Sequence, residues 1–134
     1  MWGNTGWSAD LEFLTAVISR CTNYPRLTIL ECGSGLTTVL LSVVAKHCRH
    51  TLISLENDSE WMVEIGQRLK KLKAIETRPT GTMVFHAPLI SYGEFDWYDI
   101  SAACLDGMHI DVVVCVYSSQ GGPRFQMMRD RAST

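Results

Sequence analysis

Apolar side chains recur at helical spacing in three segments of the chain. The segments run from Ser8 to Cys21, from Leu36 to His47 and from Ser59 to about Lys73. In the first segment, the residues that would share one helix face are Leu11, Leu14, Val17, Ile18 and Cys21. Pro25 should end this helix, because the residue before a proline disfavours the α region. The pattern therefore predicts three amphipathic helices.

Between and after the helices, continuous apolar runs predict buried strands. They are Leu27 to Leu30, His50 to Leu55, Met83 to His86 and Ile110 to Tyr117. Strands made of continuous apolar residues that alternate with helices are typical of a parallel sheet covered on both faces. We therefore predict an α/β fold, a Rossmann-like and mostly parallel sheet with helices on both faces. Residues 91–108 are expected to be irregular and aromatic, and residues 118–134 to form an irregular tail.

Length and composition narrow the class of protein. The 134 residues suit a single domain, and the net charge of −2 argues against a nucleic-acid or anionic-lipid partner. No apolar stretch approaches the ~18 residues of a membrane helix, and the N-terminal sequence lacks a signal-peptide pattern. The five cysteines include no C-x-x-C pair, which argues against a disulfide framework or a zinc site. We expect no bound metal and a reducing, cytoplasmic location.

The first predicted strand leads through a glycine turn, Glu31-Cys32-Gly33-Ser34-Gly35, into a helix. Ligands of open parallel sheets bind at the carboxyl ends of the strands. Gly33 permits a tight turn, and Gly35 lets a ligand approach the backbone. Glu56 closes the second strand 23 residues after Gly33, where an acid can accept hydrogen bonds from both hydroxyls of a ribose. The pattern predicts a nucleoside-containing ligand.

Two further positions bear on which nucleoside the chain binds. A phosphate-binding P-loop is excluded, because no Gly-Lys-Ser/Thr follows the turn. The dinucleotide fingerprint needs a glycine where Thr38 stands, which disfavours NAD. Glu31 can hold either a loop amide or the cationic amino end of an amino-acid ligand.

The segment from Leu30 to Thr38 resembles motif I of class I S-adenosylmethionine-dependent methyltransferases, in the subgroup with Glu-x-Gly-x-Gly-x-Ser/Thr-Thr. Ser54 to Asp58, followed by Trp61, resembles the ribose-binding second motif of that family. Phe85 to Leu89 resembles the end of its third strand, which borders the adenine, and Ile110 to Cys115 its fourth strand. The resemblance covers roughly residues 7–117.

The resemblance implies S-adenosyl-L-methionine as the cofactor and a small-molecule acceptor as the substrate. The residues implied for the methionine portion and the helix start are Glu31, Gly33, Ser34, Gly35, Thr37 and Thr38. Those implied for the ribose and adenine are Glu56, Asn57, His86 and Ala87. His86 is also the candidate general base, because it ends a strand at the ligand-binding edge. The alternative for His86 is a half-exposed histidine with no catalytic role.

Two features depart from the family pattern. Where similar methyltransferases commonly carry Asp-Gly-Pro after the fourth strand, this sequence reads Val116-Tyr117-Ser118. The family fold also has seven strands, and the pattern here supplies four, so we expect a fold truncated at the C-terminal side. These departures favour an alternative function, a catalytically inactive cofactor-binding or interaction module. A third alternative is an NAD-linked oxidoreductase.

A truncated sheet has a physical consequence. The apolar strand from Ile110 to Tyr117 would stand at an edge, and exposed apolar edges pair with other chains. We therefore predict a homodimer through that edge, or an edge that is swapped or covered.

The span from Pro79 to Pro123 contains no lysine or arginine. Its carboxylates and aromatic residues include Tyr92, Glu94, Phe95, Asp96, Trp97, Tyr98, Asp99, Asp106 and Asp111. The segment either lines a pocket for a cationic or aromatic acceptor, or is a solvated connection whose aromatic side chains lie on the core.

Overall fold

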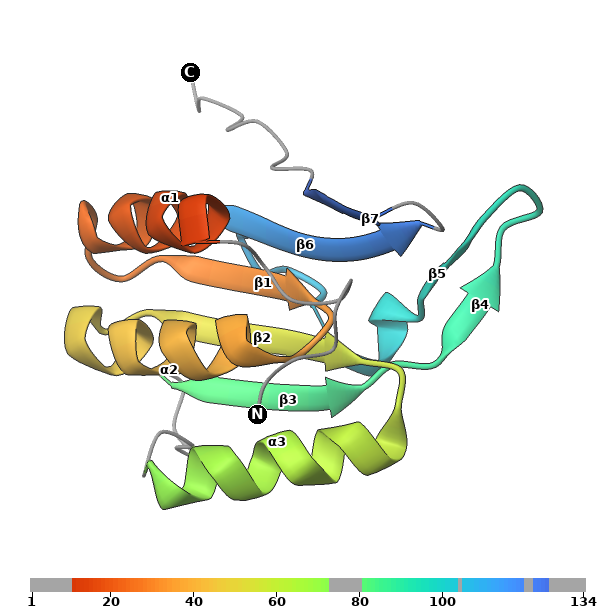
Figure 1. Ribbon diagram of the computed structural model, residues 1–134, viewed down its shortest axis with the longest axis horizontal. Helices are drawn as coiled ribbons and strands as arrows, with labels where there is room; N and C mark the ends of the chain where they lie inside the picture. The colour runs from red at the N-terminus through yellow and green to blue at the C-terminus, as the bar shows by residue number, and fades with distance from the viewer. Residues whose placement is uncertain (1–10, 73–80, 104, 120–121, 126–134) are drawn as a thin grey trace.

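The computed structural model describes residues 11–72, 81–103, 105–119 and 122–125. The first half of the chain alternates helices and strands: α1 (Leu11–Thr22), β1 (Thr28–Cys32), α2 (Leu36–Cys48), β2 (Thr51–Glu56), α3 (Ser59–Lys71) and β3 (Thr82–His86). The second half holds a hairpin, a 3-10 helix and two further strands: β4 (Leu89–Ser91), β5 (Asp96–Tyr98), η1 (Ile100–Ala103), β6 (Val112–Ser119) and β7 (Gly122–Phe125). Figure 1 shows these elements around one central sheet.

The central sheet has the strand order β3-β2-β1-β6-β7. The pairs β1–β2, β1–β6 and β2–β3 are parallel, and only β7 runs antiparallel to its neighbour. The predicted α/β class and the mostly parallel, Rossmann-like sheet are therefore confirmed, and within the described residues the sheet has fewer strands than the seven-stranded fold.

The prediction for the end of the chain is wrong over the part that the structure describes. Residues 118–125 were expected to be irregular, yet β6 continues to Ser119 and β7 pairs with it from Gly122. Backbone pairing with β6 orders β7, which has no periodicity of its own. The outer edge of β6 is thus covered by this chain, which was one of the expected outcomes for that edge. Homodimer formation stays a prediction.

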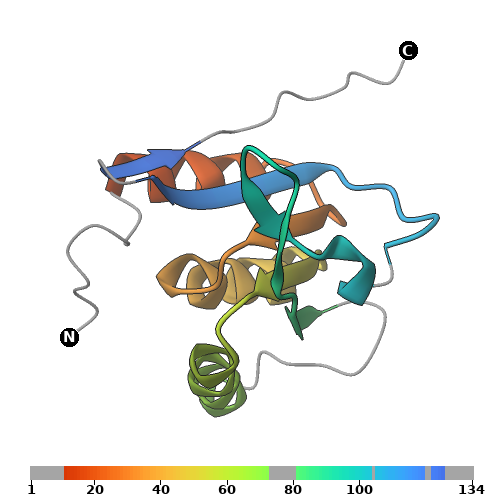
Figure 2. The ribbon, with the colours of Figure 1, turned by 90° about the vertical axis from the view of Figure 1, so that its right-hand side faces the viewer.

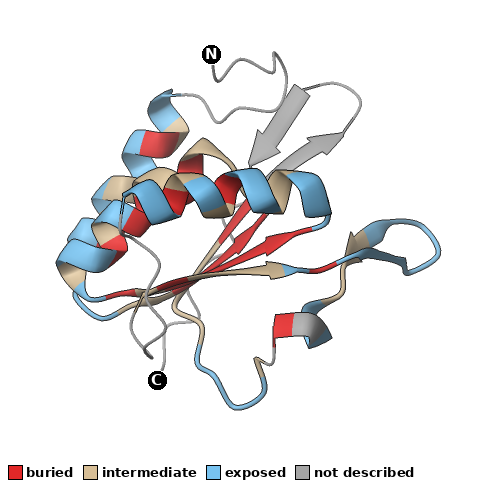
Figure 3. Cartoon of the chain, turned by 90° about the horizontal axis from the view of Figure 1, so that it is seen from below, coloured by how far each residue is buried: buried red, intermediate tan, exposed pale blue. Residues whose placement is uncertain are grey.

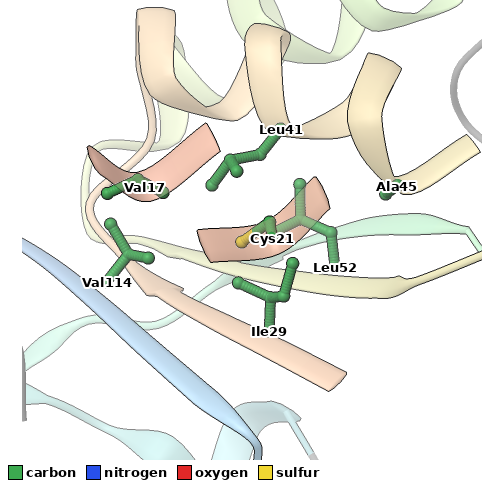
Figure 4. Packing of buried hydrophobic residues seen from close by; sticks show 7 residues of the cluster. All are labelled: Val17, Cys21, Ile29, Leu41, Ala45, Leu52 and Val114. Carbon is green, nitrogen blue, oxygen red and sulfur yellow. The ribbon is translucent and has the colours of Figure 1, made fainter. Parts of the chain in front are cut away.

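One face of the sheet packs against α1 and α2. Strand alternation places Ile29, Leu52 and Val114 on this face, where each is buried. Figure 4 shows them meeting buried side chains of the two helices, namely Val17, Cys21, Leu41 and Ala45. Burying such aliphatic side chains contributes about 1.5–3 kcal/mol each, so this cluster is a main source of stability.

The second face of the sheet has a thinner cover. Its buried strand residues are Leu30, Cys32, Ile53, Leu55 and Cys115. They contact Ala103 of η1 and, from the hairpin, Trp97 and Tyr98. The three α-helices of the described residues all lie on the first face (Figure 3). We expected helices on both faces, and in this part of the chain the only helix on the second face is the short η1. In the connection from β3 to β6, turns are favoured by Pro88 and by two glycines with positive φ, Gly93 and Gly107.

His50 joins the end of α1 to the start of β1. The ring is fully buried, its Nδ1 accepts a hydrogen bond from Leu27 N at 2.9 Å, and its Nε2 donates to the Cys21 carbonyl at 2.6 Å. We expect His50→Ala to lower the free energy of unfolding by about 3 kcal/mol, because it leaves a cavity and two unpaired backbone groups. Urea denaturation measures this. His47→Ala, at an exposed position of α2, is the matched control and should change stability by less than about 0.5 kcal/mol. Equal losses in the two variants would contradict this role for His50.

Candidate functional site

The candidate site lies where β1 and β2 end beside the start of α2. Gly33 adopts a φ of 97°, which favours glycine, and turns the chain out of β1. Its N–H donates to the Leu55 carbonyl at 2.9 Å and so ties the turn to β2. The indole Nε1 of Trp61, on α3, donates to the Ser34 carbonyl at 2.9 Å. The glycine turn is therefore fixed by hydrogen bonds to two separate elements.

Glu31 is fully buried under this turn. Its Oε1 accepts hydrogen bonds from the hydroxyls of Thr38 and Ser54, the latter at 2.7 Å. The Thr38 hydroxyl in turn accepts a hydrogen bond from Gly35 N at 2.8 Å. Glu31 thus holds the loop indirectly, through the Thr38 hydroxyl, and not by the direct bond to a loop amide that the sequence allowed.

The other oxygen of Glu31, Oε2, is buried and has no hydrogen-bond partner within the described part of the chain. Burial raises the pKa of Glu31 to about 7; the Thr38 and Ser54 hydroxyls oppose this rise, and the charge of Glu56 adds to it. An unpartnered buried oxygen is costly. A donor, above all a cationic one, would stabilise Glu31 in its ionised form.

Glu56 is 5% exposed and is held by the same turn. Its Oε2 accepts hydrogen bonds from Ser34 N, at 3.0 Å, and from the Ser34 hydroxyl, and its Oε1 accepts one from Asp58 N at 2.9 Å. A carboxylate offers about four acceptor positions. One acceptor position, on Oε1, therefore remains free. A position on Oε2 can also become free, because a ligand hydroxyl can replace the Ser34 hydroxyl there with no change in the backbone.

Gly35 occupies the N-cap position of α2. Its φ of 172° is extended backbone, which any residue adopts. A Cβ built on Gly35 meets no atom within 4 Å, so the position borders open space. Neither strain nor crowding in the fold itself requires glycine here.

Three predicted residues lie where β2 and β3 end. Ala87 is buried, and its N–H donates to the Glu56 carbonyl at 2.8 Å. His86 and Asn57 are exposed, and His86 Nε2 donates to the Asn57 carbonyl at 3.2 Å. This leaves His86 Nδ1 as the ring nitrogen that can accept a proton. All ten predicted cofactor residues thus lie on the turn, the first turn of α2 or the ends of β1, β2 and β3. Five of them are buried, namely Glu31, Thr37, Thr38, Glu56 and Ala87.

Two residues of the site received no individual role from the sequence. Ser54 is the register partner of Glu31 on the adjacent strand, a placement that only the pairing of β1 with β2 defines. Tyr98 packs on the second face of the sheet, and its pKa is raised by burial, by the charge of Glu56 and by the nearby thiols Cys32 and Cys115. The sequence grouped Tyr98 only with the other aromatic residues of its segment.

Comparisons with known proteins leave the family open. A scan against protein-family models finds no match, and a search of curated proteins finds none either. No helix of the described residues has the length and apolar character needed to cross a membrane. The same residues contain no group of three or more His, Cys, Asp or Glu placed to hold a metal ion.

Proposed function

We propose that this chain binds S-adenosyl-L-methionine and transfers its methyl group to a small-molecule acceptor. One arrangement carries the proposal: Glu31 and Glu56, at the carboxyl ends of adjacent parallel strands, flank a glycine turn whose Gly35 borders open space. Ligands of open α/β sheets bind at this edge. The proposal also agrees with the resemblance of Leu30 to Thr38 to motif I of the methyltransferases.

The donors and acceptors of the site fit the parts of this cofactor. Glu56 can accept hydrogen bonds from ribose hydroxyls, at the remaining position of Oε1 and in place of the Ser34 hydroxyl. The unpartnered Oε2 of Glu31 is an acceptor for the cationic amino group of the methionine portion, which would reach this buried atom only if the turn above it opens. Asn57 and His86 are exposed at the neighbouring strand ends, where they would border the adenine beside Ala87.

The protein's contribution to methyl transfer is mainly alignment. The bound cofactor would supply an already activated methyl group. The two carboxylates would fix the cofactor's position, and alignment of the reactants is the largest part of what such a reaction needs. For a hydroxyl acceptor, the Nδ1 of His86 is the candidate proton acceptor, because its Nε2 is already engaged with Asn57.

A substitution at Gly35 distinguishes a role in ligand binding from a role in folding. We expect Gly35→Ala to leave the free energy of unfolding within about 0.5 kcal/mol of the wild type, because its Cβ meets no atom of the chain. It should weaken the binding of S-adenosylhomocysteine by about tenfold, because the added methyl enters the space proposed for the ligand. Calorimetric titration and urea denaturation measure the two effects.

Gly33→Ala is the matched control for stability and, unlike Gly35→Ala, should destabilise the protein. The positive φ of Gly33 makes an L-residue strained there, so this variant should lose about 1–2 kcal/mol of stability. If Gly35→Ala binds as the wild type does, the space beside Gly35 is not the ligand site.

A second candidate function is a cofactor-binding module without catalysis. It is favoured by the absence of a carboxylate in Val116-Tyr117-Ser118, the positions of β6 that correspond to the Asp-Gly-Pro of similar methyltransferases. An assay with methyl-labelled S-adenosylmethionine and a broad panel of hydroxyl, amine and thiol acceptors separates the two candidates. Label transfer that His86→Ala reduces supports catalysis. Cofactor binding with no transfer to any acceptor supports the module.

A further inference from the structure

The hairpin of β4 and β5 has one face made only of large apolar side chains. Ile90 is the register partner of Trp97, and Tyr92 N donates to Phe95 O at 2.9 Å, so strand alternation brings these four side chains to one side. The rings of Tyr92 and Phe95 stack, with centroids 5.5 Å apart. Ile90, Tyr92 and Phe95 are 39%, 52% and 57% exposed. We call these three residues, together with the half-buried Trp97 that packs on the second face of the sheet, the aromatic face.

The hairpin stands at the same end of the sheet as the candidate site. It follows directly on Ala87, whose N–H is bonded to Glu56, and a hydrogen bond from Asp99 N to the Pro88 carbonyl, at 2.9 Å, closes its base. Figures 1 and 2 show the hairpin projecting beyond the carboxyl ends of β1, β2 and β3. A molecule on the aromatic face would therefore lie at the same end of the sheet as the proposed methyl donor.

The charged side chains of the hairpin and of the loop that follows it are carboxylates. Glu94 and Asp96 are exposed within the hairpin, and Asp106 is exposed in the following loop. No lysine or arginine occurs between Pro79 and Pro123. Cations are attracted both to carboxylates and to the faces of aromatic rings. Asp96 alternates to the opposite face of the two-stranded hairpin, so its carboxylate acts through its charge and not by direct contact with the rings. The rings and carboxylates of the hairpin therefore favour an occupant with a positive charge and an apolar or aromatic body.

The size of the aromatic face suits a small molecule. Each strand of the hairpin has three residues, which at ~3.4 Å per residue gives a length of about 10 Å. Two strands about 5 Å apart then present a face on the order of 100 Å². A stable protein partner needs about 800 Å² on each side, whereas one aromatic ring with a short side chain covers this face.

We infer that the aromatic face binds a small molecule with an aromatic or apolar body and a cationic amino group, and that this molecule is the methyl acceptor. The amino group would serve for binding, and a hydroxyl oxygen of the same molecule would take the methyl group as the carbon–sulfur bond of the sulfonium breaks to leave S-adenosylhomocysteine. The hydroxyl proton would pass to Nδ1 of His86. The molecule's role as acceptor rests on the proposed methyltransferase function. Binding of the aromatic amine itself does not depend on that function.

Three matched probes test the inference on the full chain, with and without S-adenosylhomocysteine. They are phenethylamine, phenethyl alcohol and hydrocinnamate, which carry a positive, a neutral and a negative group on similar bodies. We expect calorimetry to show that the amine binds about tenfold more tightly than the alcohol, and that the carboxylate binds most weakly. Glu94→Gln with Asp96→Asn should reduce this preference for the amine and leave binding of the alcohol unchanged.

The double variant Tyr92→Ser with Phe95→Ser should weaken amine binding about tenfold, and its melting temperature should stay near that of the wild type because both side chains are exposed. The matched control is Val63→Ser, at a 58% exposed apolar residue of α3, which should leave amine binding unchanged. Equal affinity for the three probes, or amine binding that survives the double variant, would overturn the inference. A dimer in sedimentation that the double variant abolishes would also overturn it, since a second copy would then cover the face.

The outcomes for the two proposals are distinct. If the amine binds and S-adenosylhomocysteine does not, the aromatic face stands as a site for a cationic ligand, and the methyltransferase function is rejected. If S-adenosylhomocysteine binds and the amine does not, the aromatic face is rejected and the cofactor site stands.

Discussion

Replacing Glu31 by glutamine should remove one component of the pH dependence of stability that we expect for the wild-type protein. Burial raises the pKa of Glu31 from 4.5 to about 7, so the folded protein holds this proton more tightly than the unfolded chain does. The contribution of Glu31 is therefore most favourable below about pH 4.5 and is lost as the pH rises to about 7. The size of that loss is roughly 3 kcal/mol, because each pKa unit corresponds to about 1.4 kcal/mol.

Urea denaturation of the wild type and of Glu31→Gln across this pH range measures the effect as a difference. Glutamine keeps an oxygen that can accept from Thr38 and Ser54 and carries no charge, so the variant should lack this component of the pH dependence. Glu12→Gln, at an exposed position of α1, is the control and should keep the wild-type dependence. A Glu31→Gln variant with an unchanged pH profile would show that Glu31 is not the buried acid responsible.

Glu56→Ala should weaken the binding of S-adenosylhomocysteine about 100-fold. Hydrogen bonds to a charged group contribute about 1.5–3 kcal/mol each, and the proposed ribose contact has two of them. The alanine variant also leaves Ser34 N and Asp58 N without their acceptors. Glu56→Gln keeps one acceptor oxygen and the size of the side chain, so we expect a smaller loss, about tenfold.

Ser34→Ala is the matched control for Glu56. It removes the hydroxyl that occupies Glu56 Oε2 and leaves the bond from Ser34 N in place. A ligand hydroxyl then has no competitor for that position, so binding should stay equal to that of the wild type or become tighter. Calorimetric titration of the three variants gives the order of affinities. If Ser34→Ala binds as weakly as Glu56→Ala, the contact with ribose through Oε2 is wrong.

The positions of the main helices and strands were predictable because their side chains repeat with a clear period. The helical spacing of apolar side chains from Ser59 to about Lys73, for example, predicted α3, and in that helix Ile65 and Leu69 are fully buried. The glycine turn and its two acids were predictable for a related reason. A turn between a buried strand and a helix places its residues at the edge of the sheet, whatever the rest of the fold does.

Other features depend on contacts that no local pattern contains. The three-residue strands β4 and β5 are too short to show a period, and β7 is ordered by its pairing with β6. The bond between Ser54 and Glu31 follows from the register of β1 with β2. The bond between Ser34 and Glu56 joins residues 22 apart in the sequence, so it appears only when the turn is folded against β2.

The most direct test of the proposed function is a calorimetric titration of the wild-type protein near neutral pH. S-adenosylhomocysteine and NAD are the two ligands, because each places a ribose where Glu56 can bind it. The proposed function predicts saturable binding of S-adenosylhomocysteine with a Kd well below millimolar, and much weaker binding of NAD. No heat and no thermal shift with millimolar S-adenosylhomocysteine, or tighter binding of NAD, would contradict it.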